Sequence, residues 1–338
     1  MSTVHPEALK NRVVGIAQRL KKGDVRIVVL GDMILDHSIE GVPGGYHPET
    51  RVPVLKEATE QESVGGAANI ALALARLGVQ VTLFGIIGSD LPGRQMESML
   101  ERQAFPSYLV TPRGWPTPRK DWIYRREGST VQLMQRIDYD RPLSSEARQE
   151  LVGEFRARCP SDAQVLILAD HGLGSVGQES LPIIGLARQR GMTIVAIPRT
   201  LVLRGQPLDA LVLDAPEVRR LLDAPADAEP KALAMRWARE TGQHVYLSLL
   251  EEGLYVCPGG LRSGAGTLVP GYPLDNPQWM GARDITTALV GIGLALGLEP
   301  VETGRVANVF RHLVACQRGN GRVLWQDVFQ FLGIVTPV

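Results

Sequence analysis

The sequence predicts an α/β protein with a mostly parallel central sheet and helices on both of its faces. Short apolar runs recur along the chain, as is typical of buried parallel strands. Helical patterns lie between these runs, and a repeated alternation of strand and helix favours a parallel sheet. With 338 residues, of which 44% are hydrophobic, the chain is long enough to bury one large core. We therefore predict a single domain over residues 1–338.

The predicted elements follow one another without a long linker or an internal repeat. An amphipathic helix is predicted at residues 5–22, because apolar side chains recur there every three or four positions. The first strand is predicted at Arg26–Leu30, which leads into Gly31-Asp32. Further strands are predicted at Val79–Ile87, Val165–Ala169, Thr193–Ile197, Ala210–Leu213 and Val245–Leu249. Helices are predicted at Ala67–Leu77, Gln95–Arg102, Ser145–Arg158, Gln178–Arg190, Lys231–Glu240 and Ile285–Leu298.

Two segments, residues 37–64 and 118–138, do not fit the alternation. They are rich in β-forming residues and lack a helical period. They could be irregular excursions, but we favour a small β sheet that stands off the main domain and covers a site as a lid. Because small sheets with exposed edges tend to pair, we predict a homodimer that is joined through this lid.

Composition excludes several classes of protein. Lys plus Arg and Asp plus Glu each total 36, and this zero net charge argues against a general nucleic-acid binder. The most apolar predicted helix is too short to span a membrane. Three widely spaced cysteines predict neither a zinc site nor a disulfide framework, and the scattered histidines, His171 among them, are interpreted as surface or packing residues. The first twenty residues resemble no secretory signal, so we expect a cytoplasmic protein.

Ligands of parallel sheets bind at the carboxyl ends of strands, and two residue clusters fall there. Asp32 and Asp36 follow the first strand and could accept hydrogen bonds from sugar hydroxyls, although Asp32 could equally be a turn or cap residue. Gly65, Gly66 and Asn69 stand at the start of a helix, where backbone amides and the asparagine side chain can meet a ligand. Tight helix packing is the alternative explanation for this glycine pair.

A third cluster, Gly281-Ala282-Arg283-Asp284, leads directly into the most apolar predicted helix. Small residues before a buried helix can form an anion site from exposed amides and the helix dipole. Asp284, in the first turn, would face that anion and could act as a base toward a hydroxyl. It could also be a simple helix cap.

Together these clusters resemble the ribokinase-like (PfkB) sugar kinases, and within them the D-glycero-β-D-manno-heptose-7-phosphate kinases. The resemblance runs through almost the entire chain. It is carried by Val28-Val-Leu-Gly-Asp32, His47-Pro-Glu-Thr-Arg-Val-Pro-Val54, Gly65-Gly-Ala-Ala-Asn69 and Arg136-Ile-Asp138. It implies a three-layer α/β/α domain with a mostly parallel central sheet and a small β lid. We expect no counterpart of the nucleotidyltransferase domain that some heptose kinases carry.

The resemblance also implies roles for individual residues in an ATP- and Mg²⁺-dependent sugar or sugar-phosphate kinase. Asp284 would be the general base, and the anion hole would be formed by Gly281, Ala282 and Arg283. The sugar would be held by Asp32, Asp36, Gly65, Gly66 and Asn69, and a substrate phosphate by Lys120 and Arg136. The nucleotide would be bound by Asp214, Glu217, Ser248, Gly253 and Asn308, with Glu217 also organising the metal.

Departures from the family pattern cluster on the phosphoryl-transfer side. Arg283 stands where the family has a glycine, Arg199 follows proline where the family has lysine, Leu173 replaces a lysine, and Leu250 replaces a nucleotide-loop glycine. Arg283 would either fill the space of the transferred phosphate or clamp that phosphate with its guanidinium. Three functions therefore stay open: a working kinase, a sugar-phosphate-binding or scaffold pseudokinase, and a pocket that serves a reaction without ATP.

Overall fold

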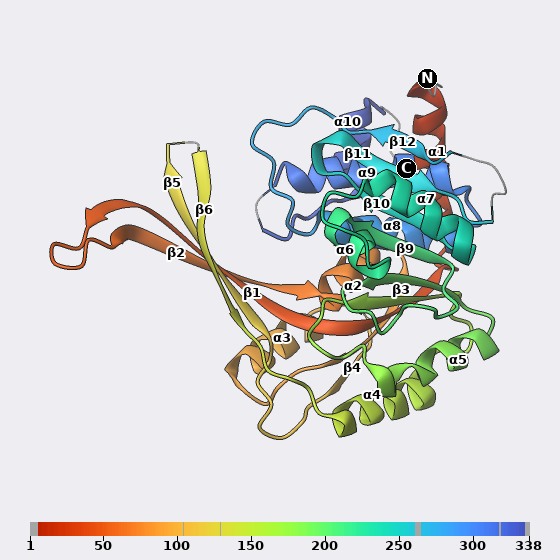
Figure 1. Cartoon of the computed structure of the whole chain (residues 1–338), viewed down its shortest axis with the longest axis horizontal. Coiled ribbons are helices and arrows are strands. Elements are labelled where there is room, and N and C mark those ends of the chain that lie inside the picture. Colours follow the sequence, from red (N-terminus) through yellow and green to blue (C-terminus); the bar gives the residue numbers. More distant parts are fainter. Residues whose placement is uncertain (1–5, 104, 129, 261–264, 318, 335–338) are drawn as a thin grey trace.

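In the computed structural model, a twisted central sheet lies between two layers of helices (Figure 1). The structure describes residues 6–103, 105–128, 130–260, 265–317 and 319–334. The sheet order is β12-β11-β10-β9-β8-β7-β1-β3-β4, and its strands are parallel except where β11 pairs with β10 and β12. The strands are β1 (Arg26–Tyr46), β3 (Gln80–Ile86), β4 (Ser107–Val110), β7 (Val165–Asp170), β8 (Thr193–Pro198), β9 (Ala210–Asp214), β10 (His244–Ser248), β11 (Gly253–Cys257) and β12 (Thr267–Pro270). The predicted α/β class with a mostly parallel sheet is confirmed.

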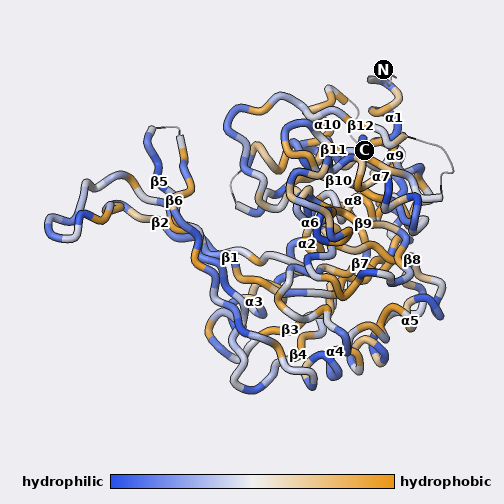
Figure 2. The backbone as a smooth tube through the Cα atoms, viewed as in Figure 1, coloured by the Kyte–Doolittle hydropathy of each residue, from blue (hydrophilic) through white to orange (hydrophobic). Residues whose placement is uncertain are grey.

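Each face of the sheet has its own apolar core, because successive side chains of a strand point to opposite faces. In β1, Ile27 and Val29 belong to one core and Val28 and Leu30 to the other. The first core is covered by α1 (Pro6–Lys21), α2 (Ala67–Arg76), α3 (Leu91–Glu101), α8 (Ala282–Ala295), α9 (Pro300–Ala315) and α10 (Trp325–Leu332). The second is covered by α4 (Ser145–Arg158), α5 (Pro182–Gln189), α6 (Ala215–Leu221) and α7 (Pro230–Thr241). Figure 2 shows apolar residues concentrated in the strands of the main sheet.

The lid is a four-stranded sheet that continues the main sheet outward as an arm (Figure 1). The second half of β1 pairs antiparallel with β2 (Pro53–Gly66) and parallel with β5 (Arg119–Glu127). β6 (Thr130–Tyr139) pairs antiparallel with β5. Both segments that departed from the strand–helix alternation therefore form regular β structure, and the irregular alternative does not apply.

The predicted first strand was too short. The sequence suggested an end near Gly31-Asp32, but β1 continues without a break to Tyr46. Gly31 lets β1 lie close to the neighbouring strand β7 at this point. Any larger residue would place its Cβ atom 2.2 Å from the carbonyl oxygen of Ala169. β1 thus joins the main sheet directly to the lid.

Two helices have boundaries that differ from those predicted from the sequence. Gln178–Arg190 is divided into a 3₁₀ turn at Gln178–Ser180 and α5, because Pro182 has no backbone N–H and begins a new helix. α8 begins at Ala282, so Asp284 lies in its first turn. In the part of the chain that the structure describes, no helix is both long and apolar enough to cross a membrane.

Candidate active site

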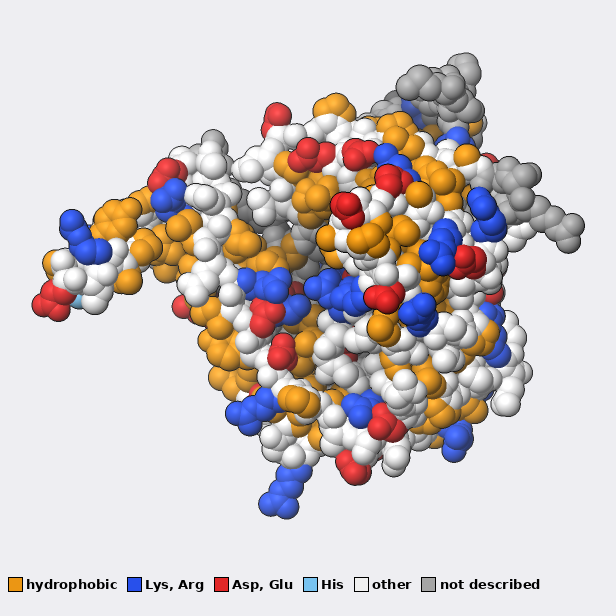
Figure 3. All heavy atoms as spheres, viewed as in Figure 1, with side chains coloured by type: hydrophobic (Ala, Val, Ile, Leu, Met, Phe, Trp, Pro, Cys, Tyr) orange, Lys and Arg blue, Asp and Glu red, His pale blue; other side chains and the backbone are white. Residues whose placement is uncertain are grey.

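A cavity of about 300 Å³ lies where the lid joins the main sheet, between the ends of β9 and β10 and the start of α8. Figure 3 shows Lys and Arg side chains gathered near this junction of arm and body. Many of the predicted site residues reach the wall of this cavity: Asp36, Gly66, Lys120, Asp214, Ser248, Gly281, Ala282, Arg283 and Asp284. Residues from three distant sequence clusters are thus brought together, as the positions after parallel strands predict.

Asp284 is buried at the start of α8 and is held by the predicted sugar-binding asparagine. The Nδ2 atom of Asn69 donates a hydrogen bond to Oδ2 of Asp284 at 2.7 Å. Burial raises the pKa of Asp284 to about 6, although Asn69 and the charge of Arg283 act in the opposite direction. Gly281, at φ 74° immediately before the helix, lets the chain turn into α8 in the left-handed region. This carboxylate is positioned and poised to exchange a proton near neutral pH.

His171 also faces this carboxylate, which its interpretation as a surface or packing residue did not foresee. Its Nε2 atom lies 4.0 Å from Oδ1 of Asp284 and is buried without a hydrogen-bond partner among the described residues. Burial, together with the charge of Arg283, keeps the pKa of His171 well below its usual value. His171 is therefore a neutral side chain in the wall of the cavity, able to bond to a ligand.

Asp36 is held by two residues that sequence reasoning missed. The indole Nε1 of Trp122 donates to Oδ1 at 2.9 Å, and Nδ2 of Asn320 donates to Oδ2 at 2.9 Å. Asn320 also donates to the backbone carbonyl of Val64 at 3.0 Å. Burial raises the pKa of Asp36, although both donors favour the charged form. The carboxylate is thus fixed in the cavity wall, between the lid and the loop before α10.

The glycine pair has a packing role that the sequence left open. A Cβ atom on Gly65 would lie 2.2 Å from Oδ2 of Asp36, and one on Gly66 would lie 2.2 Å from the carbonyl oxygen of Asp32. Gly66 also has φ 60°, a conformation that favours glycine. The absence of side chains therefore lets β2 approach β1 closely, while Gly66 still contributes to the cavity wall.

Asp32 is fully buried and organises a loop. Its carboxylate accepts hydrogen bonds from the backbone amides of His171 at 2.8 Å, Leu173 at 2.9 Å and Ser175 at 2.8 Å. Both oxygens are thereby used to hold the segment after β7, which carries His171 to the cavity. The predicted direct contact of Asp32 with a sugar stays a prediction.

Arg283 points toward the residues predicted to bind metal and nucleotide. Its guanidinium forms an ion pair with Glu217 and lies 3.4 Å from Oδ2 of Asp214. The guanidinium of Arg199 lies 3.5 Å from the same Glu217 oxygen. Burial alone would lower the pKa of Arg283, but the carboxylates of Glu217 and Asp214 raise it. Arg283 is therefore a fixed positive charge against these two acids.

Both oxygens of Glu217 and one oxygen of Asp214 are engaged by close contacts, whereas Oδ2 of Asp214 has only the 3.4 Å contact with Arg283 among the described residues. Asp214 caps α6 by accepting from the amide of Glu217 at 2.9 Å, and Oε2 of Glu217 accepts from the amide of Asp214 at 3.0 Å. The other Glu217 oxygen is paired with Arg283. Within the described residues, no group of three or more His, Cys, Asp or Glu side chains could hold a metal. Direct coordination by Glu217 would therefore have to displace one of these bonds, and the predicted organisation of Mg²⁺ by this residue stays a prediction.

A second arginine, Arg311 of α9, occupies the region of the predicted nucleotide loop. Its guanidinium lies 4.4 Å above the ring of Trp279 and donates to Oγ of Ser248 at 3.3 Å and to the carbonyl of Leu250. It also donates to Asn308 at 3.4 Å. Leu250 keeps the left-handed backbone, φ 51°, that a glycine would adopt at this position. Arg311 therefore occupies two polar groups of this loop.

Of the remaining predicted site residues Lys120, Arg136 and Gly253, only Lys120 lines the cavity. The strand neighbour of Lys120 in β1 is Asp36. Arg136 lies on an exposed strand of the lid, where it is paired with Asp138 at 2.8 Å. Gly253 begins β11 with φ 112°, and a Cβ atom there would lie 2.0 Å from the carbonyl of Val269.

Comparison with known proteins places the chain in a family. Residues 25–124 match the pfkB family of carbohydrate kinases. The bifunctional protein HldE of Hyphomonas neptunium is 32% identical over 340 residues, which cover 98% of this chain and 68% of that protein. The chain belongs to the PfkB family of carbohydrate kinases. The bifunctional protein HldE of Coxiella burnetii (strain RSA 331 / Henzerling II) is 26% identical over 317 residues, 92% of this PfkB chain and 64% of the relative.

Solved structures of PfkB-type kinases share the fold. The phosphofructokinase-2 of Escherichia coli in complex with fructose-6-phosphate superposes with a TM-score of 0.71 at 17% identity, over 91% of this chain and 99% of that one. A putative ribokinase from Agrobacterium tumefaciens superposes with a TM-score of 0.68 at 14% identity, over 91% of this chain and 97% of that one. The predicted ribokinase-like fold of this PfkB protein is therefore confirmed.

Proposed function

We propose that this PfkB protein transfers the γ-phosphate of ATP to a hydroxyl of a sugar phosphate of the heptose type. The observation that carries the proposal is the buried Asp284, which Asn69 fixes at the wall of the cavity and whose pKa is raised to about 6. Family membership and the HldE relatives support a carbohydrate substrate. We expect the reaction to take place in the cytoplasm, where ATP is available.

The proposed reaction needs one base and one oriented hydroxyl. The carboxylate of Asp284 accepts the hydroxyl proton as the sugar oxygen attacks the terminal phosphorus of ATP and the bond to the ADP oxygen breaks. The products are a doubly phosphorylated sugar and ADP, with the proton left on Asp284. Asn69 holds the carboxylate in place through a neutral hydrogen bond, which leaves the negative charge needed for proton transfer.

ADP release tests this proposal. The protein is incubated with ATP and, in turn, heptose 7-phosphates, hexose phosphates and the unphosphorylated sugars. We expect ADP formation that depends on one of the sugar phosphates and that is lost in Asp284→Asn. No ADP above the rate without sugar, across the whole panel, would contradict the proposal.

A second candidate function is sugar-phosphate binding without phosphoryl transfer. It is favoured by the ion pair of Arg283 with Glu217 and by Arg311, which occupies groups of the predicted nucleotide loop. A protein of this kind would be stabilised against heat by a sugar phosphate but not by ATP. A ligand at 100 times its Kd stabilises by about 2.7 kcal/mol, so the two cases are readily separated by thermal denaturation.

We also propose that two copies pair through their lids. β2 and β6 are the outer strands of the lid sheet and have no further strand partner among the described residues. Large apolar or aromatic side chains of the arm are exposed: Tyr46, Val52, Leu133, Met134 and Tyr139. Open strand edges with exposed apolar groups favour association. Light scattering should give twice the monomer mass, and a monomer at all concentrations would contradict this.

A further inference from the structure

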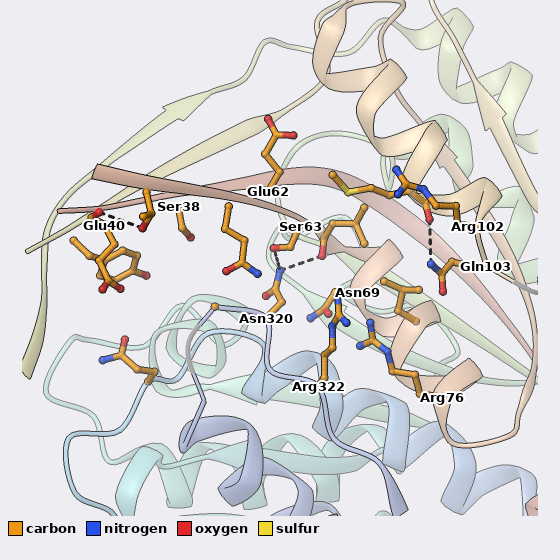
Figure 4. Close-up of a pocket in the computed structure, with 18 of the residues that line it drawn as sticks. Ser38, Glu40, Glu62, Ser63, Asn69, Arg76, Arg102, Gln103, Asn320 and Arg322 are labelled. Atoms are coloured by element: carbon orange, nitrogen blue, oxygen red, sulfur yellow. Dashed lines mark hydrogen bonds between the residues drawn. The ribbon is translucent and has the colours of Figure 1, made fainter. Parts of the chain in front are cut away.

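A second, larger cavity adjoins the first and carries an excess of positive charge at one end. Its volume is about 610 Å³, and it lies between the lid strands β1 and β2, helices α2 and α3, and the loop before α10. Figure 4 shows Arg76, Arg102 and Arg322 together at one end, with Ser38 and Glu40 at the other and Ser63 and Asn320 between them. None of these arginines belongs to the pattern from which we predicted a substrate site.

The three arginines line the cavity without acidic partners among the described residues. Among the described residues, no carboxylate lies within ion-pair distance of Arg76, Arg102 or Arg322. Arg102 bonds only to Ser98 of its own helix, through Oγ at 3.2 Å and the carbonyl at 3.0 Å. Burial, and then the charge of Arg322, lower the pKa of Arg76. Like charges that converge without a counter-ion are suited to an anionic ligand.

Two amide side chains connect this cavity with Asp284. Asn69 lines the larger cavity and donates its hydrogen bond to Asp284. Asn320 lines both cavities and donates to Asp36. One elongated molecule that passes these two amides can therefore place a hydroxyl at Asp284 and its far end among the arginines.

We propose that Arg76, Arg102 and Arg322 bind the phosphate group of the substrate, at the end of the molecule remote from the hydroxyl that faces Asp284. This inference rests on the proposed function, because it identifies the substrate as a sugar phosphate. It assigns the phosphate to residues other than Lys120 and Arg136, and Arg136 is already paired with Asp138.

The other lining residues favour a sugar phosphate and fix its direction. Between the arginines and the lid the wall carries neutral polar groups suited to hydroxyls, namely Gln61, Ser63, Gln103, Gln278 and Asn320. Glu40 and Glu62 also line this cavity, and their carboxylates disfavour a phosphate beside them. The phosphate is therefore expected at the arginine end only.

Calorimetry without ATP tests this site independently of any kinase activity. The parent protein and the variants Arg76→Gln and Arg322→Gln are titrated with heptose 7-phosphate, mannose 6-phosphate and fructose 6-phosphate, and with each sugar lacking its phosphate. Arg94→Gln is the matched control, because Arg94 is an exposed arginine of α3 that lines neither cavity. Arg322 is also exposed, so its replacement is not expected to disturb folding.

We expect the parent to bind at least one sugar phosphate more tightly than the matching sugar. Each arginine variant should weaken the binding of the sugar phosphate roughly ten- to a hundredfold, because a hydrogen bond to a charged group contributes this much. The affinity for the sugar without phosphate should change by less than about twofold. Equal affinity of the parent for sugar and sugar phosphate, or an equal loss for both in the variants, would overturn the proposal. Absent turnover with ATP would instead count against the kinase proposal alone.

Discussion

The smaller cavity and the residues directly behind its wall fall into two halves, which hold their acidic side chains in different ways. In one half, which we call the Asp284 half, Asp284 and Asp36 accept hydrogen bonds from Asn69, Trp122 and Asn320. All three donors are neutral. They fix the position of each carboxylate, and burial raises the pKa of both acids although nearby positive charges, Arg283 for Asp284 and Lys120 for both acids, act against the increase.

In the other half, which we call the Arg283 half, the acids are Asp214 and Glu217, and the groups that meet them are guanidinium groups. Arg283 pairs with Glu217 and lies beside Asp214, and Arg199 lies 3.5 Å from Glu217. These contacts compensate the charge as well as fix the position. An acid held by neutral donors remains available for proton transfer, whereas an acid paired with arginine already has its counter-ion.

The largest effect is expected at the acid of the Asp284 half. Asp284→Asn should lower turnover by roughly 10²–10⁴-fold, because a positioned general base contributes on this order. Affinity for the sugar phosphate should change only a few-fold, since the amide still fits the site. Steady-state kinetics together with calorimetry separates the two quantities. The control is Asp275→Asn, because Asp275 is an exposed aspartate of the loop before α8. An equal loss of turnover in this control would mean that the effect is not specific to Asp284.

The next effect concerns the stability of the Arg283 half. Arg283→Ala should lower the free energy of unfolding by about 3 kcal/mol, because it leaves the fully buried Glu217 with only Arg199 nearby. Adding Glu217→Gln should recover most of this loss. Denaturant unfolding measures both, with exposed Arg204→Ala as the control. Equal stability of Arg283→Ala and the parent would mean that the ion pair does not hold this half together.

A smaller, graded effect is expected from pH. The base must be ionised, and the pKa of Asp284 is raised to about 6, so kcat/KM should rise about tenfold per pH unit below 6 and level off above it. Asn69→Ala removes the donor that favours the charged form and should move this break to higher pH. A profile that is flat between pH 5 and 8 would exclude Asp284 as the titrating base.

The smallest effect concerns Leu250, whose backbone is in the left-handed region at φ 51°. Leu250→Gly should stabilise the protein by at most about 1 kcal/mol, because glycine relieves the strain but costs more conformational entropy on folding. The side chain is exposed, so no buried contact is lost. Denaturant unfolding is the measurement, and destabilisation by more than 1 kcal/mol would show that Leu250 itself contributes packing to the loop.

The sequence predicted those parts of the protein that depend on local signals. Apolar runs located the central strands, and clusters after the strands identified residues that converge on the cavity. Short edge strands such as β4 and β12, of four residues each, left no recognisable pattern. The extension of β1 through Asp32 was missed because aspartate after glycine is typical of a turn.

The pairings within the site depend on the tertiary structure and were not predictable. Arg283 meets Glu217 across 66 positions, and Asn320 meets Asp36 across 284. A glycine–asparagine–glycine sequence around Asn320 indicates a loop but not what it contacts. The replacement of a glycine by Arg283 was visible in the sequence, whereas the acid that the new side chain would meet was not.

Product formation shows whether the Asp284 half is catalytic although the Arg283 half carries its own counter-charges. ATP and a sugar phosphate that the protein binds are incubated with it, and phosphorus NMR follows the reaction. If Asp284 is catalytic, a new sugar-phosphate resonance grows in equal amount with ADP. Tight binding of the sugar phosphate with no new resonance would contradict a catalytic role of Asp284 and leave the protein as a binding protein of the PfkB fold.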